Sequence, residues 1–419
     1  MIDSLKVIHV IKAYGKEVLS FCLLSSDLLF RIVKVFKPHW RKLKLNSLEE
    51  YVNRNQLVKE VLNGESVFNY KMAAPDRSVY EEWQYKEVIR RDCTRQYISL
   101  LNNVCVRGDT DAIITEEFFL TDKILFDRVG FLQHLPYRTA VKNDDCIILQ
   151  NNRDERRVEK AVFLIKMWSY NYFHFVFEGL SRLGEIDKLS EYDNWPIIID
   201  SCVKNDRRNL EIIDLLNYKN REIIWIDKGE IIHVDNLIVP PCLSWGIWDI
   251  YESVRNGWGY MIDKRAGEFL RNTVLNQYKP QRNYNCVYVA RGNNKRLINE
   301  PEIIDYFIKN DFEIFYPDKI ETFREEVDCF ASANCIVCCA GGASVNLIFC
   351  KDKVDVYGLL PFEFRCDSPN DITDIIGVNT HMIDGEVVEN GELLMTSTFT
   401  IPIEKCQRIV DCCKEKGLL

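Results

Sequence analysis

The alternation of apolar strands and helices between residues 285 and 351 constrains this chain more than any other feature. Three short apolar runs have the character of strands, NCVYVAR, FEIFY and CIVCCA. Between and after them lie segments with helical spacing of apolar residues, PEIIDYFIKN, ETFREEVDCFASA and ASVNLIF. Because such alternation is typical of βαβ units, this stretch predicts a parallel sheet in an α/β fold.

Cations and a glycine turn follow these predicted strands at their carboxyl ends, where open α/β sheets bind ligands. The third strand ends in the turn from Gly341 to Ser344, where backbone N–H groups at a helix start can hold a phosphate because no Cβ blocks the approach. Arg291 ends the first strand, and its guanidinium suits bidentate binding of phosphate. The pattern therefore predicts a diphosphate site with the candidate residues Arg291, Lys295, Arg296, Gly341, Gly342, Ala343, Ser344 and Asn346. The alternative for the three cations is an ordinary solvated loop charge.

A second candidate group lies on the helix predicted from Asn171 onward. Apolar residues that recur at three and four positions predict its buried face: Phe173, Val176, Phe177, Leu180, Leu183 and Ile186. His174 and Glu178 share another stripe, one helical turn apart. His174 can take a proton from a hydroxyl group, since imidazole titrates near neutrality, and Glu178 can hold the imidazole or act as the base itself. The alternative is a structural His–Glu pair, with Glu178 and Arg182 joined in a helical ion pair.

Three segments resemble glycosyltransferase family 61, and they occur in the order and at the spacing of that family. They are NYFHFVFEGLSRL from residue 171, ARGNNKRLINEPEI from residue 290 and AGGASVNLIFC from residue 340. The chain departs from the family pattern at Phe175, Ser181 and Ala340, where the family has Trp, Pro and His. Asp355 lies one register from the position of the family's acidic residue.

The resemblance implies an α/β protein with two Rossmann-like domains facing a cleft, the GT-B type, after a helical N-terminal segment. It implies an inverting glycosyltransferase that moves a hexosyl or pentosyl group from a nucleotide sugar, with a UDP-sugar as the expected donor. The acceptor would be a glycan or lipid-linked glycan in cell-surface or capsular polysaccharide synthesis. Ala340 and the displaced acidic residue leave a second interpretation open, a non-catalytic nucleotide-sugar-binding protein of a polysaccharide assembly. A nicotinamide oxidoreductase is disfavoured, because no G-x-G-x-x-G follows a first strand.

The pattern of elements divides the chain into four parts. Residues 1–45 are predicted as a basic helical segment, 46–280 as an acceptor-side α/β domain, 281–400 as the nucleotide-sugar-binding Rossmann-like domain, and 401–419 as a C-terminal helix. In the architecture that the family implies, the last helix often crosses back to the first domain. Between residues 30 and 44 basic residues alternate with Phe and Val, which predicts contact with an anionic membrane surface or, alternatively, a helix packed on the body or on a partner.

Charge and cysteine content exclude several classes. A net charge of −9 argues against nucleic acid as a partner. Charged residues interrupt the apolar N-terminus, so no secretory signal is expected, and together with 16 cysteines this predicts a cytoplasmic location, at the inner face of the membrane if the N-terminal segment binds lipid. The cysteines are interpreted as small apolar residues rather than a metal or redox site. No Asp-x-Asp follows a strand near the glycine turn, so no metal is expected to hold the diphosphate and cationic side chains would take that role.

Overall fold

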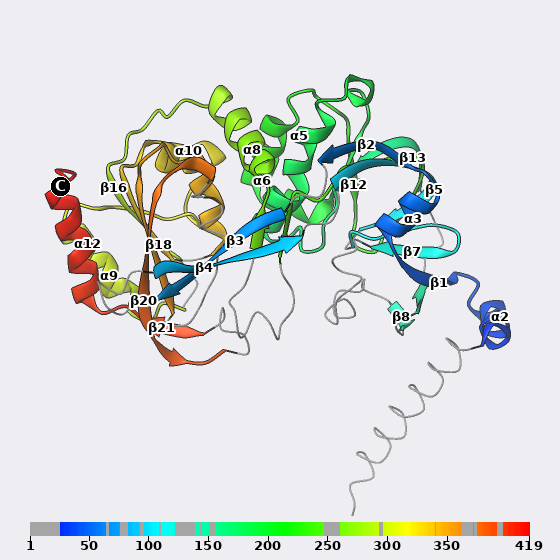
Figure 1. Ribbon diagram of the computed structural model, residues 1–419, viewed down its shortest axis with the longest axis horizontal. Helices are drawn as coiled ribbons and strands as arrows, with labels where there is room; N and C mark the ends of the chain where they lie inside the picture. Colours follow the sequence, from blue (N-terminus) through cyan, green and yellow to red (C-terminus); the bar gives the residue numbers. More distant parts are fainter. Residues whose placement is uncertain are drawn as a thin grey trace, which may run out of the picture.

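Two β-sheets with helices packed between and around them form the protein, which confirms the predicted α/β class (Figure 1). The computed structural model describes residues 26–63, 67–75, 83–92, 96–108, 110–121, 139–142, 145–150, 156–246, 260–292, 296–339, 341–361, 372, 375–391 and 397–419.

The first sheet joins a parallel half to a half that is antiparallel except for the parallel pair β1 and β7. Strands β12, β11, β10 and β13 are parallel neighbours, and β13 then pairs antiparallel with β5, from which the sheet continues through β6, β7, β1, β9 and β8. The strands are β1 (Trp40–Ser47), β2 (Val58–Asn63, paired with β5), β5 (Gln96–Arg107), β6 (Ile113–Ile114), β7 (Phe118–Thr121), β8 (Thr139–Lys142), β9 (Cys146–Gln150), β10 (Arg156–Phe163), β11 (Ile197–Asp200), β12 (Ile223–Ile226) and β13 (Ile231–Val239). Val162 of β10 pairs with Ile197 and Ile238, and all three are buried, as expected for parallel strands covered on both faces.

The second sheet has the order β17-β16-β18-β19-β20-β21 and is parallel except for β21. Its strands are β16 (Cys286–Val289), β17 (Glu313–Phe315), β18 (Cys335–Cys339), β19 (Asp355–Pro361), β20 (Asn379–Glu389) and β21 (Thr398–Thr400). The three strands predicted from residue 285 onward are therefore confirmed. Every residue of β16 and β18 is buried, which explains why these segments are continuously apolar rather than alternating.

Helices between the sheets share one hydrophobic core with residues of both (Figure 1). They are α6 (Arg207–Leu216), α8 (Lys264–Gln277), α10 (Phe323–Ser332) and the 3₁₀ helix η6 (Gly342–Phe349). A capping box of Thr322 and Glu325 starts α10, and Phe323, Val327 and Phe330 bury one face of it. Because the core is continuous from one sheet to the other, apolar packing holds them face to face across the site described below.

Two short pairs of strands lie outside these sheets. Strands β3 (Val67–Pro75) and β4 (Trp83–Asp92) form a ribbon, and β4 contacts β20 of the second sheet (Figure 1). Strands β14 (Ser244–Gly246) and β15 (Tyr260–Ile262) form the other pair.

Part of the prediction for residues 1–45 is wrong. Helix α2 (Asp27–Phe36) is present, and residues 1–25 lie outside the described part of the chain. Trp40 to Ser47, however, form strand β1, which pairs with β7 on one side and β9 on the other. Leu43 is fully buried there opposite Ile147, so pairing with distant strands decides the structure of this segment.

The C-terminal helix α12 (Ile403–Glu415) does not cross back to the first sheet. It packs with α9 (Glu300–Lys309) on the face of the second sheet that points away from the first (Figure 1). The buried side chains of α12 are Cys406, Ile409, Val410 and Cys413. The apolar stripe of this helix therefore completes the hydrophobic core on this face of the second sheet.

Candidate active site

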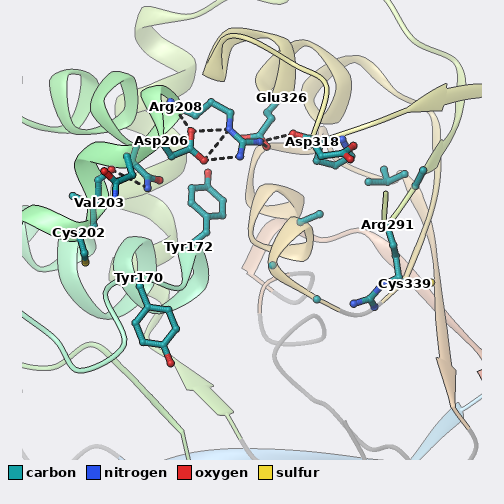
Figure 2. A pocket seen from close by; sticks show the side chains of 18 residues that line it. Tyr170, Tyr172, Cys202, Val203, Asp206, Arg208, Arg291, Asp318, Glu326 and Cys339 are labelled. Carbon is teal, nitrogen blue, oxygen red and sulfur yellow. Dashed lines mark hydrogen bonds and ion pairs between the residues drawn. The ribbon is translucent and has the colours of Figure 1, made fainter. Parts of the chain in front are cut away.

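A cavity of about 630 Å³ lies between the two sheets (Figure 2). Its first wall comes from Tyr170 and Tyr172, which follow β10, and from residues 202–209, which follow β11. Its second wall comes from residues 289–291, at the end of β16, and from residues 339 and 341–343, at the end of β18 and in the turn that follows. The carboxyl ends of parallel strands from both sheets therefore face one another across the cavity, the place where α/β sheets bind ligands.

Arg291 and the glycine turn lie together on the second wall, as predicted for a phosphate site. The guanidinium of Arg291 lies 3.6 Å from the place that a Cβ on Gly341 would take. A Cβ on Gly342 would meet no atom within 4 Å, so that position faces open space. Gly341, Gly342 and Ala343 all line the cavity together with Arg291. A cation and exposed backbone thus adjoin, which is the arrangement that anions favour.

The loop that carries Arg291 is held by buried hydrogen bonds. One carboxylate oxygen of Glu300 accepts the backbone N–H of Arg291 at 2.8 Å and the hydroxyl of Tyr288 at 2.9 Å. Gly292 has φ of +63°, and a Cβ there would collide with the carboxylate of Asp318. The positive φ favours glycine at this position, and it lets the chain turn immediately after Arg291.

The other predicted donor-site residues take different places. Lys295 lies outside the described residues, as does Ala340, where the family has His. Arg296 is half-buried, and it does not line the cavity. The hydroxyl of Ser344 donates to the carbonyl of Gly341 at 2.7 Å, so it closes the turn rather than pointing outward. Asn346 is buried and accepts a hydrogen bond from the hydroxyl of Tyr172 at 3.0 Å, which links the two walls.

A charged group on the other side of the cavity was not predicted from the sequence (Figure 2). Arg208 of α6 binds Asp206 through two nitrogens, the shorter distance being 2.6 Å, and reaches Glu326 of α10 at 3.2 Å and the carbonyl of Pro317 at 2.6 Å. These contacts join α6, which follows β11 of the first sheet, to residues that follow β17 of the second sheet. Glu326 is only 4% exposed, and burial raises the pKa of its carboxyl to about 7, although Arg208 opposes that shift. A carboxyl that changes charge near neutrality therefore lines the cavity.

One sequence pattern could have revealed Glu326. It stands at the third position after Phe323 on α10, where Phe323, Val327 and Phe330 form the buried stripe. A carboxylate inside an apolar stripe is costly unless it is paired or has a role. No local pattern, by contrast, distinguishes Arg208 from its exposed neighbour Arg207.

The raised pKa of Glu326 predicts how stability depends on pH. In the folded protein this carboxyl keeps its proton up to about pH 7, whereas in the unfolded chain it loses the proton near its usual value of 4.5. Stability should therefore fall as pH rises from 4.5 to 7, by up to about 3 kcal/mol, since each pKa unit corresponds to about 1.4 kcal/mol. Melting temperatures of the native protein and of Glu326→Gln across this range would measure the effect. The amide should remove most of the slope, and Glu302→Gln, on the exposed side of α9, should leave it unchanged.

His174 and Glu178 form a hydrogen-bonded pair, as their shared stripe predicts. The Nδ1 atom of His174 lies 2.8 Å from a carboxylate oxygen of Glu178, and the two side chains are 12% and 8% exposed. A carboxylate can only accept, so the pairing places the proton on Nδ1 and makes Nε2 the nitrogen that takes up a proton. Arg182 donates to the carbonyls of Pro240 and Pro241.

The local helix differs from the expected regular α-helix. Residues His174–Gly179 form a π-helix (η2), followed by a 3₁₀ turn (η3, Leu180–Arg182) and the short helix α5 (Leu183–Ile186). The predicted apolar face is nevertheless buried, apart from the half-buried Phe173. π-Helical turns are rare in proteins, and those that occur often lie at functional sites. His174 does not line the cavity itself, but it lies two residues after Tyr172, which does.

Asp355, the residue nearest the family's acidic position, lies at the amino end of its strand in the second sheet, away from the cavity. It is the first residue of β19, and its carboxylate binds Lys416 at 2.6 Å and His381 at 3.3 Å. The cavity adjoins the carboxyl ends of these strands, so Asp355 belongs to a separate ion-pair group.

Residues 172–357 match the family model of glycosyltransferase 61. The matched segment begins at Tyr172 on the first wall and contains Arg208, Arg291, Glu326 and the glycine turn. This segment, 186 of the 419 residues, is therefore similar to glycosyltransferase family 61, and the resemblance of its three motifs is confirmed. The family supports glycosyltransferase activity, with a nucleotide sugar as donor and a glycan as acceptor in general. Among curated proteins, none matches this chain.

Proposed function

We propose that this protein is an inverting glycosyltransferase of the GT-B type that transfers a hexosyl or pentosyl group from a UDP-sugar. The acceptor would be a glycan or lipid-linked glycan in cell-surface or capsular polysaccharide synthesis. One observation carries the proposal: the carboxyl ends of parallel strands from both sheets face each other across a cavity that holds Arg291 and a glycine turn on one side and the motif segment on the other. A donor diphosphate on the second wall would place its sugar toward the first.

The chemistry follows from charge development during transfer. The acceptor oxygen attacks the anomeric carbon from the face opposite the diphosphate, so the configuration inverts and the bond to the diphosphate oxygen breaks. Arg291 stabilises the negative charge that grows on the leaving phosphate. His174 takes the acceptor's proton at Nε2, and Glu178 stabilises the imidazolium that forms, because the carboxylate lies 2.8 Å from Nδ1.

A donor screen tests this function. Purified protein would be incubated with a panel of nucleotide sugars, with and without oligosaccharide acceptors, and released nucleoside diphosphate would be measured. We expect release from at least one donor, increased by an acceptor and lost in His174→Ala. Binding of a nucleotide sugar without release from any donor would instead support the non-catalytic nucleotide-sugar-binding interpretation.

We infer further that helix α2 contacts an anionic membrane surface, at the cytoplasmic face in this proposal. The helix lies at the edge of the first sheet, beyond β1 (Figure 1). Phe30 packs inward against Ile148, whereas the outward face carries the exposed residues Leu28, Leu29, Ile32, Val35 and Phe36. The basic residues Arg31, Lys34 and Lys37 on the same helix are exposed as well. Exposed apolar and basic residues on one helix are typical of interfacial binding. No helix among the described residues has the length and apolarity to span a bilayer.

Replacing the outward face of α2 should abolish binding to anionic vesicles. Removal of residues up to Ser47 would delete β1 from the first sheet, so substitution is the sharper test. The triple variant L28S/I32S/V35S should lower vesicle partitioning at least about tenfold, because each buried apolar side chain contributes about 1.5–3 kcal/mol. Flotation with phosphatidylserine vesicles measures this. Ile308→Ser and Val388→Ser, which alter exposed apolar residues elsewhere, should float like the native protein. Equal flotation of the triple variant would disprove the contact.

A further inference from the structure

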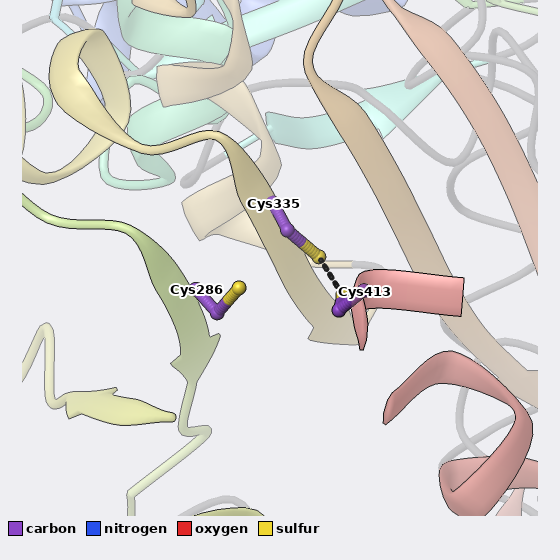
Figure 3. A group of neighbouring side chains, drawn as sticks. All are labelled: Cys286, Cys335 and Cys413. Atoms are coloured by element: carbon purple, nitrogen blue, oxygen red, sulfur yellow. Dashed lines mark hydrogen bonds between the residues drawn. The ribbon is translucent and has the colours of Figure 1, made fainter. Parts of the chain in front are cut away.

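Three cysteines that are distant in the sequence meet beneath the C-terminal helix (Figure 3). Cys286 and Cys335 are the first residues of β16 and β18 and lie opposite each other in the register of these parallel strands. Cys413 reaches the same point from α12, and its Sγ lies 3.4 Å from that of Cys335. The three Sγ atoms lie within 4.8 Å of one another, and all three residues are buried.

This spacing suits one thiophilic metal ion. Zinc binds thiolate sulfur at about 2.3 Å, so two sulfurs on a tetrahedral zinc ion lie about 3.8 Å apart. The Sγ atoms need only small side-chain rotations to reach such distances. The carbonyl oxygen of Leu418 lies 3.8 Å from Sγ of Cys286, which places an oxygen beside the sulfurs.

Packing of cysteine as a small apolar residue does not require sulfurs to converge. Cys329, Cys350 and Cys406 are equally buried, yet in the described part of the chain only Cys286, Cys335 and Cys413 bring three ligand atoms of this kind together. We propose that Cys286, Cys335 and Cys413 bind a single zinc ion that fastens α12 to the second sheet. The site lies at the amino ends of β16 and β18, whereas the cavity lies at their carboxyl ends. The ion would therefore stabilise the fold and take no part in transfer.

Metal analysis and cobalt substitution of the full chain test this proposal. Protein purified under reducing conditions should contain one equivalent of zinc, and Co²⁺ should replace it with the intense sulfur-to-cobalt charge-transfer absorption of a thiolate site. Cys413→Ser and Cys335→Ala should lose the zinc and the absorption. Cys412→Ser, the adjacent half-buried cysteine, should keep both. Zinc removal by a chelator should lower the melting temperature of the native protein and of Cys412→Ser.

Three results would overturn it. One is native, reduced protein without stoichiometric zinc and without the cobalt spectrum. Another is metal content in Cys413→Ser equal to that in Cys412→Ser. A third is a Cys335–Cys413 disulfide in protein purified without reductant, with no metal bound after reduction. The measurement on the native protein decides the matter even if a variant fails to fold, and it is independent of any result from the donor screen.

Discussion

Replacement of His174 by Ala is expected to lower turnover about a hundredfold or more, because a general base of this kind contributes roughly that factor. Donor affinity should stay nearly unchanged, since the proposed diphosphate contacts come from Arg291 and the glycine turn on the opposite wall. Initial rates of nucleotide release with acceptor, compared with calorimetric binding of the nucleoside diphosphate, would separate the two effects.

Controls can distinguish catalysis from structure at this pair. Glu178→Gln should show a related loss, and the double variant should be less than additive if the two residues act together. His233→Ala is a matched control, because this half-buried imidazole also stands beside a carboxylate, 3.5 Å from Asp235 on β13. It should keep native turnover. If His174→Ala keeps native turnover the base assignment fails, and a sharp loss of melting temperature together with lost nucleotide binding would show a structural pair instead.

Replacement of Arg291 by Ala is expected to weaken binding of nucleoside diphosphate by about 1.5–3 kcal/mol, the contribution of a charged hydrogen bond, or roughly tenfold to more than a hundredfold. Arg291→Lys should recover only part of the loss, because an ammonium cannot bind phosphate through two parallel bonds. Titration calorimetry with UDP and GDP would measure both.

Two further variants test the geometry around Arg291. Gly342→Val should also weaken binding. The valine side chain would extend into the open space beside the backbone, which the phosphate would otherwise occupy. Arg282→Ala should have no effect, because that exposed guanidinium pairs with Glu313 on the surface of the same unit. Unchanged affinity of Arg291→Ala for every nucleotide that the native protein binds would remove Arg291 from the site.

Local sequence patterns predicted three strands of the second sheet and the wall of the cavity that follows them. Strands β16 and β18 each needed only a short apolar run, because a strand buried on both faces is apolar at every position. The turn after β18 was recognisable from its glycines, and Arg291 from its place at a strand end. The stripe from Val176 to Ile186 was equally local, and it is buried although the backbone there is a π-helix and a 3₁₀ turn. The spacing of apolar side chains therefore predicted the buried face even where the backbone is not a regular α-helix.

The sequence by itself determined the α/β class, the resemblance to the family and the wall that carries Arg291, because each depends on local patterns: a βαβ unit or short motifs. Only the tertiary structure decided that Trp40–Ser47 is a strand, since its pairing partners lie more than 70 residues away. It also brought Arg208 to Glu326, 118 residues apart, and Cys335 to Cys413, 78 residues apart. Such contacts depend on how the two sheets and their helices pack. The free energy of that packing is spread over many apolar side chains. The polar residues that packing brings together are therefore not marked by any periodic pattern in the sequence around them.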